Sequence, residues 1–360
     1  MKICMLVYNF VNNGIGKIVT SYSAKLVEDG NRVAVAAGGP IESSVKEKAA
    51  SLGIEVVQLP DKKDKCIAYL KALRKYLHRE AFDIVHVHGN SGMVVPDLMA
   101  IKSCSYSKIV CHCHSTGCEH PVLHKTLRPF ASKLSDACFA CSEEAGKWLF
   151  GCNGFVVIPN AFDCSRFAFS EIKRSEVRNK LGIPDDMFVM GNIARLNPEK
   201  NHAFLIEVFE RFHRDNPCSC LLIAGGGPGE QRVKAIAESS SASSSIRLLG
   251  DVSDPSGLYC AMDCFVFPSL HEGLGIVLVE AQLAGLDCFV SSEVPDAACV
   301  SNGYHKLSLS DGADSWAYDI SECVTIKELN ERSSQLLPCA AAFDISEAYQ
   351  ALKSEYARLF

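Results

Sequence analysis

The chain has 360 residues, of which 48% are hydrophobic and 22% charged, a composition typical of folded proteins that excludes an intrinsically disordered chain. This length usually exceeds what one hydrophobic core serves, so we expect two domains. The net charge of −6 is unevenly spread: residues 1–165 carry 19 Lys and Arg against 15 Asp and Glu, and the remainder carries 17 against 27. The more basic first half is suited to face an anionic surface. No nucleic-acid partner is expected.

Cysteine is abundant, with 18 residues whose spacings do not indicate a disulfide framework. We therefore expect reduced, mostly buried thiols and a cytoplasmic protein. The apolar run Lys2–Val7 is short and is followed by polar Asn12 and Asn13, unlike a signal peptide. No apolar run approaches the roughly 18 residues that a bilayer-spanning helix needs.

Short apolar runs alternate with amphipathic segments through the first half of the chain. Continuously apolar strands separated by helices are typical of a parallel sheet covered on both faces. The predicted strands are Lys2–Tyr8, Arg32–Ala37, Glu55–Leu59, Ile84–His88, Lys108–His114 and Ala137–Ser142, and the predicted helices are Lys17–Asp29, Ile41–Leu52 and Cys66–Arg79.

A second series of the same kind follows Pro159–Asp163. Its predicted strands are Phe188–Ala194, Cys220–Ala224, Ile246–Gly250 and Cys264–Phe267, and its predicted helices are Ala203–Asp215, Glu230–Ser239 and Ile276–Ala284. The two series predict an α/β fold of two doubly wound Rossmann-like domains, residues 1–165 and 166–344. A last helix, Ile345–Phe360, is expected to have Ser346 as its N-cap.

The strongest site signal is a pair of glutamates around the start of one predicted helix. Glu272 precedes Gly273 and Gly275 in the loop after the strand Cys264–Phe267, and Glu280 lies inside the helix. Free N–H groups at a helix N-terminus suit a phosphate, and a carboxylate can accept two hydrogen bonds from a sugar diol. The alternative is an ordinary loop glutamate and a helix glutamate paired to a lysine.

Two basic residues follow another strand of the same half. Arg195 and Lys200 lie in the loop after Phe188–Ala194, at the strand end where open parallel sheets bind ligands. An arginine fork and a lysine point charge can neutralise a diphosphate leaving group. The alternative is two solvated basic side chains.

The glycine-rich stretches match no nucleotide-binding fingerprint. Gly225–Gly229 lacks the G-x-G-x-x-G spacing, and the Gly14–Gly16 turn is not a P-loop because Ile18 stands where Ser or Thr is needed. Cys111–His114 with Cys138 and Cys141 could supply metal ligands, but alternate strand residues point to opposite faces. We expect no metal, and the absence of Asp-x-Asp agrees with this expectation.

A basic amphipathic segment covers Cys66–Arg79, preceded by Lys62, Lys63 and Lys65. With His124–Arg128 it could touch anionic lipid. The alternative is an ordinary solvated helix on a sheet.

Taken together, these stretches resemble the retaining glycosyltransferases of family 4, which have the GT-B architecture. The resemblance covers most of the chain, and the Glu-x7-Glu block with basic residues upstream is its most specific part. It rests on Gly14–Gly16, Asp83–His88, His114-Ser115, Ala140–Ser142, Val157–Asp163, Ala194–Leu196 with Lys200–His202, Gly225–Pro228, and Glu272 with Glu280. The runs Cys141–Phe150 and Leu278–Gln282 are most similar to bacterial capsule and exopolysaccharide glycosyltransferases.

The resemblance implies two domains that face a cleft, with helix Ile345–Phe360 crossing back to the first. It implies that Glu280 holds the donor ribose, Glu272 the donor hexose, and Arg195 with Lys200 the diphosphate. Backbone amides of Gly273, Leu274, Gly275 and Ile276 would assist, Gly14 and Gly16 would approach the phosphates, and His114 would lie near the reacting sugar. Asn13 stands where the family often has a glycine, which leaves that backbone contact open.

The expected activity is transfer of a hexose from a nucleotide sugar, most simply a UDP-sugar, to a saccharide or lipid-linked saccharide in cell-surface polysaccharide synthesis. The family retains the anomeric configuration, and no cofactor is expected. A cytoplasmic protein, peripheral on the inner face of the membrane, fits this activity. The alternatives are a UDP-sugar 2-epimerase of the same architecture and a non-catalytic nucleotide-sugar-binding protein.

Overall fold

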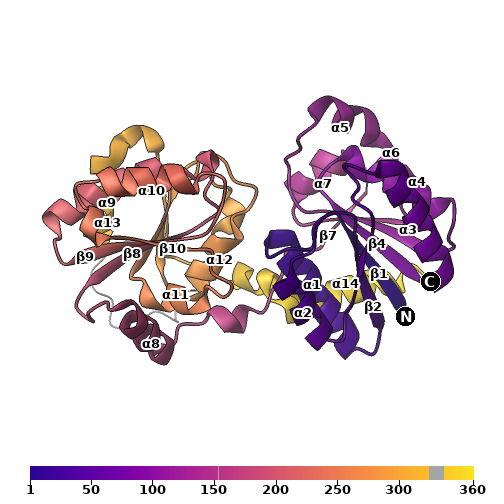
Figure 1. Cartoon of the computed structure of the whole chain (residues 1–360), viewed down its shortest axis with the longest axis horizontal. Helices are drawn as coiled ribbons and strands as arrows, with labels where there is room; N and C mark the ends of the chain where they lie inside the picture. The colour runs from indigo at the N-terminus through magenta and orange to yellow at the C-terminus, as the bar shows by residue number, and fades with distance from the viewer. Residues whose placement is uncertain (153, 324–335) are drawn as a thin grey trace. The chain divides into compact units, whose positions relative to one another are not determined.

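Residues 1–152, 154–323 and 336–360 are described by the computed structural model, and they fold as two α/β units (Figure 1). The first unit comprises Met1–Asp163 with Ala341–Phe360, and the second comprises Cys164–Ala340. The sequence-based boundary was set after residue 165. Residues 324–335 of the predicted second domain lie outside the described residues.

The first unit is built on a seven-stranded parallel sheet with the order β3-β2-β1-β4-β5-β6-β7. Its strands are β1 (Lys2–Val7), β2 (Arg32–Ala37), β3 (Glu55–Gln58), β4 (Ile84–Gly89), β5 (Lys108–Cys113), β6 (Ala137–Ala140) and β7 (Val156–Val157). Its helices are α1 (Gly14–Glu28), α2 (Ser43–Ser51), α3 (Cys66–Glu80), α4 (Val95–Lys102), α5 (Pro121–Leu127), α6 (Pro129–Leu134), α7 (Glu143–Phe150) and α14 (Ile345–Ala357).

Helices cover both faces of this sheet, as continuously apolar strands require. Alternate strand residues such as Cys4 and Leu6 join one buried cluster with side chains of α3, α4, α6 and α7. On the other face, α14 lies beside α1 (Figure 1). The C-terminal helix therefore completes the layer that begins with the first helix of the chain.

The second unit has a six-stranded parallel sheet with the order β10-β9-β8-β11-β12-β13. Its strands are β8 (Phe188–Ile193), β9 (Ser219–Ala224), β10 (Ile246–Gly250), β11 (Cys264–Phe267), β12 (Asp287–Ser291) and β13 (Tyr304–Leu307). Its helices are α8 (Glu171–Leu181), α9 (His202–Asp215), α10 (Glu230–Ser239), α11 (Ser256–Ala261), α12 (Ile276–Leu283) and α13 (Gly312–Cys323). Helices α9, α10 and α13 share a core around fully buried Trp316, and α8, α11 and α12 lie on the other face (Figure 1).

An ion-paired network fixes the start of β11, the strand that leads to the glutamates. Asp263 accepts hydrogen bonds from Arg174 and Arg178 of α8, each at 2.7 Å, and from the backbone N–H of Val189 at 2.8 Å. Arg178 is 1% exposed, and a charge buried so deeply needs such a partner. The network therefore joins α8, β8 and β11.

One predicted N-cap and one predicted helix start were wrong. Asp344, not Ser346, is the N-cap of α14, because its Oδ1 accepts a hydrogen bond from the Ser346 N–H at 2.8 Å. Helix α1 begins at Gly14 and not at Lys17, since the Asn13 side chain caps it by accepting from the Gly16 N–H at 2.9 Å. In both cases a side-chain oxygen accepts a hydrogen bond from a free helix N–H two or three residues further along the chain.

Candidate active site

The loop between β11 and α12 presents an open helix start. Helix α12 is preceded by Gly275, whose φ of 79° is favourable only for glycine, and no side chain caps its first turn. The Leu278 N–H donates to the Gly275 carbonyl at 2.8 Å, and the N–H groups before it in the first turn are available to an anion. Gly273 is exposed, and Leu274, Gly275 and Ile276 are partly buried. These are the four residues whose amides were predicted to assist phosphate binding.

Lys200 and Glu272 form an ion pair across two loops. Each side chain is only 15% exposed, and the Lys200 ammonium also lies 5.2 Å from the centre of the Phe267 ring. The loops are joined by the Leu270 N–H, which donates to the Glu199 carbonyl at 2.7 Å. The structure therefore brings together two residues that the sequence had assigned to different parts of a ligand.

Arg195 extends from the end of β8 and is exposed. The glycine-rich stretch holds its loop in place: the Leu196 N–H donates to Gly226 at 3.0 Å, and the Gly229 N–H donates to Leu196 at 2.8 Å. A Cβ at Gly225 would lie 1.9 Å from the Ala194 carbonyl oxygen. These glycines therefore support the arginine loop by close backbone packing.

Glu280 is buried, with 2% exposure. The hydroxyl of Tyr259 donates a hydrogen bond to its Oε2 at 2.8 Å. Tyr259 lies on α11, is 0% exposed, and its pKa is raised well above its ordinary value by burial and by the nearby Glu280 charge. The tyrosine is therefore neutral and acts as a donor. Sequence reasoning missed it, because no spacing links Tyr259 to the Glu-x7-Glu block.

In the first unit, Gly14 and Gly16 lie in the first turn of α1. A Cβ at Gly16 would come 2.1 Å from the Val11 carbonyl oxygen, so a side chain cannot fit there. The Gly16 N–H is already bonded to the Asn13 side chain. The close backbone turn was anticipated, whereas the use of the Gly16 amide in capping was not.

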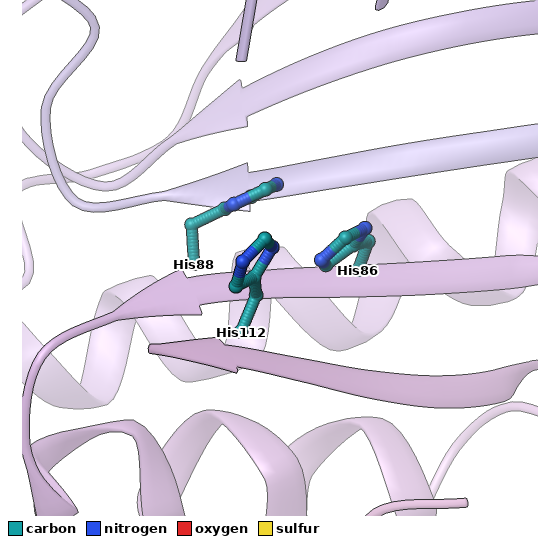
Figure 2. Close-up of side chains that lie close together, drawn as sticks. All are labelled: His86, His88 and His112. Carbon is teal, nitrogen blue, oxygen red and sulfur yellow. The ribbon is translucent and has the colours of Figure 1, made fainter. Parts of the chain in front are cut away.

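His114 belongs to a row of four buried imidazoles. His86 and His88 lie on β4, and His112 and His114 lie on or just after β5; Figure 2 shows the first three side by side. Because side chains alternate and His88 is in register with His112, all four share one face of the sheet. The paired His-x-His spacing was the signal that could have revealed the row.

Both ring nitrogens of His114 have protein partners. Its Nδ1 lies 2.7 Å from Asn160 Oδ1, and its Nε2 lies 2.8 Å from His88 Nδ1. Burial lowers the pKa of His114 to about 4 and holds the pKa values of His86, His88 and His112 well below the ordinary range. All four rings are neutral at pH 7.

One nitrogen from each of His86, His88 and His112 lies within 4.8 Å of the others. The rings of His86 and His88 are stacked, with centroids 4.2 Å and planes 17° apart. The nitrogen lone pairs lie in the ring planes, so two stacked rings do not direct them to one point. We therefore interpret the row as packed neutral imidazoles and not as ligands of one ion.

The architecture and the site define a class of protein: two Rossmann-like units, one of which gathers cations, carboxylates and a helix N-terminus at the carboxyl edge of its sheet. The same fold occurs in HepE of Anabaena, solved in complex with UDP and glucose (TM-score 0.80, 18% identity, 99% of this chain and 100% of that one). Sucrose-phosphate synthase of Thermosynechococcus elongatus is similar as well (TM-score 0.78, 15% identity, 100% of this chain and 99% of that one). The fold is GT-B.

Two family models match the chain in succession. Residues 12–166 match Glycosyltransferase Family 4, and residues 173–335 match Glycosyl transferases group 1. The chain therefore belongs to the family 4 and group 1 glycosyltransferases, and it is a hexosyltransferase, as the resemblance predicted.

Curated relatives agree with this assignment. EpsF of Bacillus subtilis (strain 168), whose name assigns it to the glycosyltransferases, is 29% identical over 290 residues, 76% of this chain and 75% of that protein. The UDP-Gal:alpha-D-GlcNAc-diphosphoundecaprenol alpha-1,3-galactosyltransferase of Escherichia coli is 28% identical over 251 residues, 65% of this chain and 64% of that protein.

Proposed function

We propose that this glycosyltransferase moves a hexose from a UDP-sugar to a saccharide or lipid-linked saccharide, with retention, in capsule or exopolysaccharide synthesis. The observation that carries the proposal is the contact of Lys200 with Glu272 beside the uncapped start of α12. This arrangement offers a cation and free N–H groups for a diphosphate and a carboxylate for sugar hydroxyls. UDP is favoured because HepE was solved with UDP and glucose and the Escherichia coli relative is named for UDP-Gal.

In this proposal the charges act on the leaving group. When the bond between the anomeric carbon and the diphosphate oxygen breaks, the electron pair stays on UDP. Lys200, Arg195 and the α12 N-terminus then stabilise the transition state more than the ground state. The acceptor oxygen attacks on the leaving-group face, and its proton passes to the departing phosphate. No enzyme nucleophile and no metal are required.

The remaining site residues keep the roles that the resemblance implies. Glu280 would hold the ribose and Glu272 the hexose, while Gly14 and Gly16 would approach the phosphates. His114 would contact the reacting sugar without acting as a proton donor, because its lowered pKa of about 4 keeps the ring neutral.

The proposal is tested by incubating the protein with a panel of UDP-sugars and saccharide or lipid-linked acceptors and following UDP release and product configuration. Lys200→Met should lower kcat/KM about 100-fold or more, because it removes a cation from the leaving group. Lys234→Met is the matched control, since Lys234 is an exposed lysine of α10 in the same unit. Addition of EDTA should leave the rate unchanged.

Three results would contradict the proposal or its site. Accumulation of a C2-epimerised UDP-sugar without acceptor would identify the alternative 2-epimerase. Nucleotide-sugar binding with neither transfer nor hydrolysis across the panel would identify a binding protein. Equal rates for Lys200→Met and wild type would show that Lys200 does not act on the leaving group.

We also propose that the protein is cytoplasmic and touches an anionic membrane from the first unit. No described helix is long and apolar enough to cross a bilayer. Around α5 and α6, Val122 is 81% and Phe130 49% exposed, next to exposed Lys125 and Lys133. Exposed apolar and basic side chains together suit an anionic lipid surface.

Part of the predicted basic surface is not available for this contact. Lys62 is paired with Asp97 at 2.5 Å, and His124 is 2% exposed and stacked on Trp148. The expectation that both face lipid was therefore wrong, because each meets a closer partner within the unit. Sedimentation with vesicles should fall when Val122 and Phe130 are both changed to Ser, and equal binding to neutral and anionic vesicles would contradict the electrostatic part.

A further inference from the structure

We propose that Ser269 is a positioning residue of the donor site: its buried hydroxyl holds the loops of Lys200 and Glu272 at a fixed separation. The inference rests on the proposed UDP-sugar function, in which Lys200 acts on the diphosphate and Glu272 on the hexose. It adds to the site a residue for which the sequence predicted no role.

The side chain of Ser269 is enclosed in the second unit, two residues after the end of β11. It is 0% exposed. Its Oγ lies 3.0 Å from the carbonyl oxygen of Glu199 and 2.9 Å from that of His271. A serine hydroxyl carries one proton, so these two carbonyls share a single donor. The hydroxyl is thereby confined between two segments of backbone.

The two carbonyls belong to the residues that immediately precede the ion pair. Glu199 precedes Lys200, and His271 precedes Glu272. A carbonyl lies in the same rigid peptide plane as the N–H and the Cα of the following residue, so a bond to the Glu199 carbonyl orients the start of Lys200. The bond to the His271 carbonyl does the same for Glu272. One hydroxyl therefore acts on both partners of the ion pair.

Further hydrogen bonds hold Ser269 itself in place. Its carbonyl oxygen accepts from the hydroxyl of Ser291, the last residue of β12, which is also 0% exposed. The next residue along the chain, Leu270, donates its N–H to the Glu199 carbonyl at 2.7 Å. Ser269 is thus tied to the end of β12 and to the loop that follows β8, and close packing leaves its hydroxyl little freedom.

The hydroxyl contributes something that the backbone bond of Leu270 does not. Without it, the Glu199 carbonyl would stay bonded to the Leu270 N–H, whereas the peptide between His271 and Glu272 would lose the Ser269 donor. The Glu272 carboxylate would then occupy a wider range of positions. Because misplacement of a group that holds the substrate can lower a rate by up to about 100-fold, the loss should appear in turnover.

The test is a double-mutant cycle that combines Ser269→Ala with Glu272→Ala and follows UDP release during hexose transfer. We expect Ser269→Ala alone to lower kcat about tenfold, with a smaller change in KM, because the hexose is held less precisely. In the Glu272→Ala background the same change should lower kcat by about twofold at most, since no carboxylate is left to position. Rates are divided by the concentration of UDP-binding sites from calorimetry, so a smaller folded fraction cancels.

Ser219→Ala is the matched control. Ser219 is 1% exposed, and its hydroxyl donates to the Asn216 carbonyl at 2.6 Å. It begins β9, at the opposite end of the parallel strands from the site, so its loss should leave kcat unchanged in both backgrounds. Ser269→Cys should have an intermediate kcat, because a thiol is a weaker donor. It replaces Ser269→Ala in the cycle if the alanine variant does not bind UDP.

The outcomes separate this inference from the function on which it rests. Wild-type transfer that Ser269→Ala leaves unchanged, or slows equally with and without the Glu272 carboxylate, would overturn the positioning role alone. An effect of the same size in Ser219→Ala would overturn it too, because a loss shared with a distant serine does not depend on the site. A wild type that neither binds UDP nor transfers a hexose would overturn the proposed function and this inference with it.

Discussion

Lys200 and Glu272 neutralise each other, and a ligand with a diphosphate and a hexose would offer each of them a new partner. Both side chains are 15% exposed, so their mutual attraction is screened less than that of a surface pair. A diphosphate that approaches Lys200 must compete with Glu272. The ion pair therefore exists before the ligand binds, and it weakens the affinity of Lys200 for phosphate.

Because of this competition, removal of the Glu272 charge should increase the affinity for UDP. Glu272→Gln should bind UDP several-fold more tightly than wild type, because Lys200 loses its competing carboxylate and an ion pair of this kind contributes about 1 kcal/mol. Turnover of a UDP-sugar should fall, since the hexose loses its acceptor. Calorimetry with UDP and steady-state kinetics measure the two effects. Glu238→Gln, on exposed α10, should change neither, and weaker UDP binding by Glu272→Gln would contradict the idea.

The sequence located some of these residues and could not locate others, for a physical reason. Arg195, Lys200 and Glu272 follow strand ends, and strand ends are visible as the limits of apolar runs. Tyr259 contacts Glu280 only because α11 packs near α12, and His88 meets His114 only through the register of β4 and β5. Contacts made by packing leave no spacing signal along the chain.

At the scale of elements, α14 is fastened to the first unit through a buried polar contact. The Tyr356 hydroxyl lies 2.6 Å from His86 Nδ1, and both residues are 1% exposed. The Nε2 of His86 has no partner among the described residues. The bond to Tyr356 is therefore the main polar contact of this ring.

Tyr356→Phe should lower the free energy of unfolding of the first unit by about 1–3 kcal/mol, because His86 Nδ1 is left buried and unpaired. Urea denaturation followed by the fluorescence of Trp148, in the first unit, measures the change. Tyr76→Phe is the matched control: Tyr76 is a buried residue of α3 whose hydroxyl has no partner in the described part of the chain. Equal effects of the two variants would show that the hydroxyl of Tyr356 contributes nothing.

Element prediction succeeded for most buried strands, although buried β12 was not predicted. Strands such as β1 and β9 are buried along nearly their whole length and stand out as apolar runs. Edge strand β13 reads Tyr-His-Lys-Leu and is partly exposed, and β7 has only two residues, so neither has an apolar run to detect. The cap of α14 was misplaced because Asp344 and Ser346 are both good N-cap residues, and only the backbone geometry distinguishes them.

At the scale of the molecule, the two units differ in how many buried histidines they hold. In the first unit His86, His88, His112 and His114 all have lowered pKa values, caused mainly by burial. In the second unit His202 has its pKa lowered to about 4 by burial and by the charge of Lys200. Acid should therefore destabilise the first unit more strongly.

Acid destabilises a unit with buried neutral histidines because its unfolded state binds more protons than its folded state. An unfolded histidine has its pKa near 6.5 and takes up a proton below that pH, whereas the folded ring stays neutral until the pH approaches its lowered pKa, about 4 for His114. The unfolded state thus binds more protons in this window, and stability present above pH 6.5 is lost as the pH falls. Each such histidine lowers the free energy of unfolding by up to about 1.4 kcal/mol for each pH unit of acidification. The window from pH 6.5 to 5 lies above the ordinary carboxylate range, so the slope reports on histidines.

Urea denaturation at pH 7, 6 and 5 gives the free energy of unfolding of each unit from the fluorescence of its tryptophan. The value from Trp148 should therefore fall more steeply with decreasing pH than the value from Trp316, the tryptophan of the second unit. His112→Gln should reduce the slope of the first unit. Its amide can still donate to the Ile158 carbonyl, which lies 3.1 Å from His112 Nε2, but it cannot take up a proton. Parallel slopes for the two units, or an unchanged slope in His112→Gln, would mean that the buried imidazole row does not govern the response of the protein to acid.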